Sequence, residues 1–136
     1  MPSRGSSLVE SLVAMSVFSI GSAATGAWFI QTTFADARAS RLLAATAIAA
    51  SLEARMRSNA VAVADGDYTE ASSAAGCVRS CDGKALAADD LRHFREVLAE
   101  GVGPAAQGAV RCKSASSCVI RITWKGLEVL EWAVEL

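Results

Sequence analysis

The chain has 136 residues, of which 52% are hydrophobic but only 6% aromatic, and its formal net charge at pH 7 is −1. This length allows one modest domain in addition to any membrane segment. A chain close to neutrality lacks the excess of basic residues that nucleic-acid-binding proteins usually carry, so no nucleic-acid partner is expected. The low aromatic content predicts a small hydrophobic core.

The first thirty residues combine a short leader with an apolar segment. Residues 1–5 read Met-Pro-Ser-Arg-Gly, and residues 8–30 are apolar enough to form a membrane-spanning helix. Between Arg4 and Asp36 the only charged side chain is that of Glu10. A carboxylate at bilayer depth costs about 2.5 to 3.5 kcal/mol on insertion scales, so it normally has a partner. Since no neighbouring cation in the sequence can serve, we expect the partner to come from another molecule.

Two simpler interpretations of this segment compete. A secretory signal could be cleaved near the small residues 23–27, and a plain single-span anchor needs no cleavage. Neither interpretation explains Glu10. The positive-inside rule does not orient the segment, because Arg4 precedes it while Arg38 and Arg41 follow it closely.

The apolar segment continues into a region that favours a helix. Residues 32–59 contain no Pro or Gly and are rich in Ala, with Leu, Arg, Glu and Met at many of the other positions. Ile48, Leu52 and Met56 recur at four-residue spacing and form an apolar stripe. We predict one helix from near Ser7 to Asn59, about 75 Å long at 1.5 Å per residue. A head domain of this size cannot bury such a helix, so lipid or other helices must cover its first half.

Residues 60–136 are predicted to form the head domain. A loop follows Asn59, and Asp89 or Asp90 is expected to cap a short helix that runs to about Glu100, with the single histidine, His93, on its surface. Three strand-like runs follow, and the last two are joined by a tight turn at Lys125-Gly126. We therefore predict an α+β fold in which a small antiparallel sheet packs on the outer half of the long helix. The expected strands are residues 108–112, 118–124 and 127–136.

All four cysteines lie in the C-terminal half, at Cys77, Cys81, Cys112 and Cys118. In a small tethered domain with little core, this clustering favours disulfides and an oxidising compartment, which would place the head outside the cytoplasm. Three pairings are possible, and the short separations favour Cys77 with Cys81 and Cys112 with Cys118. A zinc site built from the four thiolates, or a redox-active pair, is the alternative.

The leader resembles the class III leader of type IV prepilins and pseudopilins, which a prepilin peptidase cleaves after a Gly. The resemblance implies cleavage between Gly5 and Ser6, methylation of the new amino group of Ser6, and Glu10 at position five of the mature chain. In that family the equivalent Glu is thought to pair with the amino terminus of a neighbouring subunit. The amino terminus of the neighbouring subunit would thus supply the cation that Glu10 lacks. The family usually begins its mature chain with Phe or Met, whereas this chain would begin with Ser.

The segments at residues 7–15, 18–21, 55–59, 81–91 and 123–124 are similar to the PilV family of minor pilins. This resemblance implies a type IV pilin-like fold with residues 1–5 as leader, residues 6–59 as the long helix and residues 60–136 as a periplasmic, disulfide-containing head. It also implies a non-enzymatic subunit without a cofactor, held in the inner membrane by a single span and later moved to the pilus fibre or tip. There it would take part in pilus priming, adhesion and twitching motility.

The partners implied by the resemblance are other minor pilins, the major pilin, the prepilin peptidase and the inner-membrane assembly platform. The sequence contains no Ser/His/Asp, Cys/His or paired-carboxylate arrangement typical of catalysis, which agrees with a structural role. A minor pseudopilin of type II secretion is the nearest alternative. A membrane-anchored redox or zinc protein that uses the four cysteines is the alternative from another class.

Overall fold

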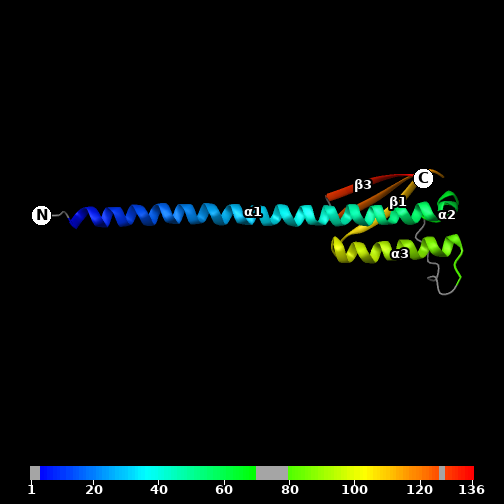
Figure 1. The fold of residues 1–136 in the computed structure, drawn as a ribbon, viewed down its shortest axis with the longest axis horizontal. Helices are drawn as coiled ribbons and strands as arrows, with labels where there is room; N and C mark the ends of the chain where they lie inside the picture. Colours follow the sequence, from blue (N-terminus) through cyan, green and yellow to red (C-terminus); the bar gives the residue numbers. More distant parts are fainter. Residues whose placement is uncertain (1–3, 70–79, 126–127) are drawn as a thin grey trace. The chain divides into compact units, whose positions relative to one another are not determined.

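The computed structural model describes residues 4–69, 80–125 and 128–136 (Figure 1). Contacts between residues divide the chain after Ala39 into two units, which are treated separately below. Among the described residues the order of elements is three helices followed by three strands. The fold class is α+β and pilin-like in layout, as predicted: the last part of a long N-terminal helix packs on a small antiparallel sheet together with a shorter helix.

Helix α1 spans Arg4–Ser58 and contains 55 residues. It begins three residues before the predicted start at Ser7 and ends one residue before the predicted end at Asn59. At its C-terminus the backbone N–H of Asn59 donates to the carbonyls of Arg55 and Met56, which closes the last turn. A short helix that was not predicted, α2 (Ala60–Ala64), follows immediately.

The second long helix starts earlier than predicted. Helix α3 spans Gly83–Gly101, and its N-cap is Asp82, whose side chain accepts from the backbone N–H of Ala85 at 2.8 Å. The expectation that Asp89 or Asp90 caps this helix is wrong, because both lie inside it. Three candidate caps occur within nine residues, and the segment between Asp82 and Asp89 is rich in Ala and lacks Pro, so the first cap is used.

The sheet matches the prediction closely. Strands β1 (Gln107–Ser114), β2 (Ser117–Trp124) and β3 (Glu128–Glu135) form an antiparallel meander in the order β1-β2-β3. Cys112 is paired with Cys118 across β1 and β2, and Ile120 with Trp132 across β2 and β3. Lys125 begins the turn after β2 with a left-handed φ of 54°, while the rest of the predicted turn, Gly126, lies outside the described residues.

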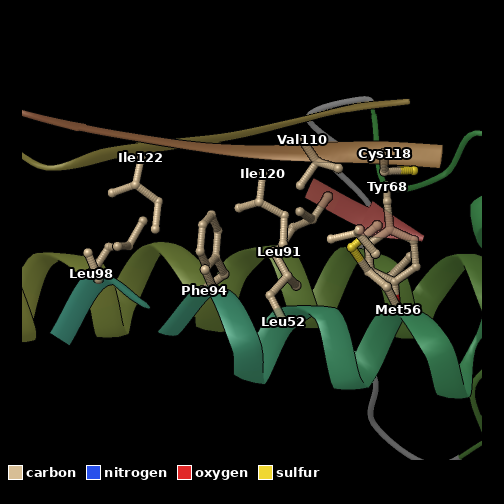
Figure 2. Packing of buried hydrophobic residues seen from close by; sticks show 14 of the residues in the cluster. Leu52, Met56, Tyr68, Leu91, Phe94, Leu98, Val110, Cys118, Ile120 and Ile122 are labelled. Carbon is tan, nitrogen blue, oxygen red and sulfur yellow. The ribbon is translucent and has the colours of Figure 1, made fainter. Parts of the chain in front are cut away.

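The core of residues 40–136 lies between the sheet and two helices. Leu52 and Met56 of α1 reach toward the sheet, and Ile120 and Ile122 of β2 point back at them (Figure 2). Phe94 is among the residues of α3 that fill the space beside them (Figure 2). Ala45 and Ala49 are fully buried on the same face of α1, as the predicted stripe required. Small residues at these positions let neighbouring elements approach the helix closely.

Gly108 of β1 lies directly against α3. A Cβ at this position would lie 2.2 Å from Cε1 of Phe94 and 2.6 Å from Cδ1 of Leu98. Both side chains are buried in the core, so neither can swing away into solvent. The missing side chain therefore sets how closely α3 approaches the sheet.

We expect Gly108→Ala to lower the free energy of unfolding by about 1 to 3 kcal/mol, as is typical of an overfilled core. Urea denaturation of the full chain in a mild detergent measures the change. Ala109→Ser at the exposed neighbouring position serves as the control and should leave the midpoint almost unchanged. Equal midpoints for the two variants would contradict this account of the contact.

Candidate functional site: the apolar helix and its carboxylate

The first part of α1 exposes large apolar side chains that the chain itself does not cover. Leu8 is 75% exposed, Phe18 74% and Phe34 69%, and the large hydrophobic residues between them are exposed to a similar degree. Soluble monomers rarely leave apolar surface of this extent in water. Among the described residues, one helix is long and apolar enough to cross a membrane, and it begins at Leu8. The segment is thus a candidate single membrane span.

Five hydroxyl groups of this segment are satisfied within the helix. Each donates to a backbone carbonyl three or four residues earlier, at distances from 2.7 to 2.9 Å. Hydrocarbon offers no hydrogen-bond partners, so a spanning helix must pair its polar groups internally. The hydroxyls that make these bonds belong to Ser16, Ser19, Thr25, Thr32 and Thr33.

Glu10 differs from these hydroxyl groups. It lies on α1 with an exposed side chain, and no hydrogen bond or ion pair to it occurs within the described part of the chain. The predicted cleavage residues Gly5 and Ser6 belong to the same helix in the uncut chain. Glu10 therefore combines a charged side chain, apolar neighbours along the helix and no partner among residues 4–69, 80–125 and 128–136.

Two glycines in the span leave part of its surface open. At Gly21 and Gly26 an added Cβ would meet no atom within 4 Å, so no described residue packs against either position. Small residues allow close approach of a second helix in a membrane. The span therefore offers a second helix two places for close contact.

The cysteines of the head are oxidised where the structure describes them. Cys112 and Cys118 form a disulfide across the β1–β2 hairpin, which is the predicted pairing. Cys81 is disulfide-bonded as well, while Cys77 lies outside the described residues. A bonded pair supplies no thiolate, so Cys112 and Cys118 in this state are not ligands for zinc.

A buried polar cluster, which the sequence did not reveal, attaches the end of α1 to α3. Asp90 is 3% exposed, and it accepts from Arg55 at 2.9 Å and from the hydroxyl of Tyr68 at 2.7 Å. Asn59 donates to the carbonyl of Gly83 at 2.8 Å and more weakly to Tyr68. Burial, reinforced by the hydrogen bond to Asp90, raises the pKa of Tyr68 well above its ordinary value, so its hydroxyl stays a donor.

A second polar contact attaches α1 to the last strand. The indole N–H of Trp132 donates to Oε2 of Glu53 at 2.7 Å, and Arg57 donates to the other carboxylate oxygen. These bonds, that of Trp132 foremost, lower the pKa of Glu53 below its ordinary value. Glu53 and Trp132 are 79 residues apart in sequence, so no local pattern predicts their pairing.

The comparisons with known proteins identify no relative of this chain. No protein-family model matches it, and searches of curated proteins and of solved structures gave no match either.

The lowered pKa of Glu53 predicts a dependence of stability on pH. A carboxylate whose pKa is lower in the folded state stabilises the fold above its unfolded pKa, and this contribution is lost as the pH falls through the folded value. We expect Glu53→Gln to reduce the free energy of unfolding at pH 7, with a difference from the unmodified chain that shrinks on acidification to about pH 3. Urea denaturation at both pH values tests this.

Glu135→Gln is the matched control for this measurement. Glu135 is exposed and has no partner among the described residues, so its neutralisation should have a small effect at either pH. A difference for Glu53→Gln that stayed constant from pH 7 to pH 3 would contradict a charge-dependent contact with Trp132 and Arg57.

Proposed function

We propose that this chain is a minor pilin, a non-enzymatic subunit that joins a type IV pilus through its N-terminal helix. One observation carries the proposal: a single carboxylate, without a partner among the described residues, lies in an exposed apolar segment of helix. In a helix that only anchors a protein, a charge at that depth costs free energy without a compensating contact. In a helix that assembles with others, a neighbouring subunit can supply the counter-charge.

In this proposal the prepilin peptidase cuts between Gly5 and Ser6 and creates a free amino terminus. Glu10 then accepts from the amino terminus of a subunit already in the fibre. The pair is favourable in an apolar surrounding only when charge and hydrogen bonds are both satisfied. The contact would therefore select a correctly placed, processed neighbour over a misplaced one.

The partners in the proposal are other minor pilins, the major pilin and the inner-membrane assembly platform. The head lies in the periplasm before assembly and in the fibre or at its tip afterwards, where it would influence adhesion and twitching. The oxidised Cys112 and Cys118 support an extracytoplasmic head. The attachment of α1 to the head through Asp90 and Glu53 supports a role in which force on the helix is passed to the head.

The decisive variant is Glu10→Gln, which removes the charge and keeps the size of the side chain. We expect the variant to be inserted and cleaved like the unmodified chain but to be absent from sheared pili. In a strain lacking the gene, it should restore piliation to less than one tenth of the level that the unmodified chain restores. Immunoblots of membrane and pilus fractions measure both quantities. Glu96→Gln, at an exposed position of α3, is the control and should restore piliation fully.

Full piliation by Glu10→Gln would refute pairing between subunits. A strain lacking the gene that kept its pili but lost protein secretion would instead identify a pseudopilin of type II secretion. Either result is separable from a failure of folding, because the amount of inserted protein is measured in the same experiment.

The cleavage site makes a separate prediction. Gly5→Leu should block processing, because the peptidase of this family requires the small residue before the cut. Intact-mass spectrometry of protein extracted from membranes should then show the leader of residues 1–5 retained. A mature-sized Gly5→Leu protein would overturn the assignment of Gly5 and Ser6.

A further inference from the structure

A small cavity in the head is lined by two basic side chains that form no ion pair among the described residues. It has a volume of about 150 Å³ and lies beside the end of α3, between that end, α1 and the turn after β2. Arg41 of α1 and Lys125 of the turn both line it, although they are far apart in sequence. None of the residues that line the cavity is acidic, and within the described ranges neither cation forms an ion pair.

Two further residues that line the cavity, Trp124 and Ala105, each have an N–H group without an acceptor among the described residues. The indole of Trp124 lines it and is only 6% exposed, yet its N–H is the one buried side-chain polar atom without an acceptor in the described part of the chain. The backbone N–H of Ala105, in the loop that forms the opposite wall, likewise has no partner among the described residues. Buried donors are normally paired, so the indole N–H of Trp124 indicates a missing acceptor.

The chemistry of these groups selects an oxyanion. A guanidinium and an ammonium bind phosphate oxygens through charge-assisted hydrogen bonds, and neutral N–H groups complete the set. The last turn of α3 carries partial negative charge, which the two cations offset, but a full counter-charge is absent. Val102, Pro104 and Ala106 make the remaining wall apolar, which suits the hydrocarbon part of a lipid.

The position of Arg41 in the chain identifies the source of that phosphate. Arg41 follows Phe34, an exposed apolar residue of α1, by seven residues, so chain connectivity keeps it within about 25 Å of this apolar part of the helix. Basic pockets next to membrane segments bind anionic head groups, and Trp is enriched at this depth. We propose that the cavity binds the phosphate of an anionic phospholipid at the surface of the bilayer that holds the helix.

This site depends on the span being in a membrane and not on a role in pili. Before assembly, a lipid held here would fix the height and rotation of the head on the membrane. Extraction of the helix into a fibre would remove the lipid, which makes the site a feature of the membrane-bound state.

The test uses the full chain in neutral detergent micelles with ¹⁵N-labelled tryptophan. The indole resonance of Trp124 is assigned by its loss in Trp124→Phe. It is then followed during titration with short-chain phosphatidylglycerol, short-chain phosphatidylcholine or inorganic phosphate. We expect a saturable shift with phosphatidylglycerol, with half-saturation at a concentration at least ten-fold lower than for either other probe.

The paired variant R41Q/K125Q should weaken this response at least ten-fold. R111Q/K113Q removes the same number of charges from exposed positions on β1 and should respond like the unmodified chain. The single variant Lys125→Gln changes an exposed side chain and should also weaken binding. It keeps the test informative if the paired variant misfolds, and the amide spectrum would reveal such misfolding.

Three results would overturn the proposal. Equal half-saturation by phosphatidylcholine would show that the anionic head group is not selected. Equal half-saturation by inorganic phosphate would assign the cavity to free anions rather than to lipid. A response of R41Q/K125Q equal to that of the unmodified chain would place the binding outside the cavity. None of these results bears on Glu10 or on piliation.

Discussion

The constraint on which the molecule depends is a helix that its own chain can bury only in part. From Ala45 onward one face of α1 is enclosed by the core, with Ala45, Ala49 and Met56 at 0% exposure. From Leu8 to Phe34 every large apolar side chain remains exposed. The hydrophobic effect therefore requires a second environment for the first half of the helix, whether lipid or other helices.

The buried half of α1 is held by polar contacts as well as by packing. Leu52 and Met56 contribute apolar burial, which is not directional, whereas Asp90 and Glu53 fix direction through hydrogen bonds to specific atoms. Asp90 attaches the helix to α3, and Glu53 attaches it to β3 on the far edge of the sheet. Because the two contacts lie on different elements, rotation of the helix within the head would break at least one of them.

Local signals predicted much of the fold, and long-range pairing accounts for most of what they missed. The stripe of Leu52 and Met56 and the alternation in β2 follow from periods of 3.6 and 2 residues, which a single segment carries by itself. The start of α3 was misplaced because Asp82, Asp89 and Asp90 are all acceptable caps, and only packing shows that Asp90 is needed inside. The hydrogen bond between Glu53 and Trp132 joins two positions 79 residues apart, which no local pattern connects.

The candidate site shows the same division between local and long-range information. Glu10 stood out in the sequence because a charge among apolar residues is a local anomaly, and its lack of a partner in its own chain is what the described structure adds. The donors around Trp124 could not be found in the same way, since Arg41, Ala105 and Lys125 meet only when α1, the loop after α3 and the end of β2 come together. Unsatisfied groups thus occur in both units of the chain, a carboxylate in one and cations in the other. Each is costly for an isolated chain and is relieved by an environment of the opposite charge.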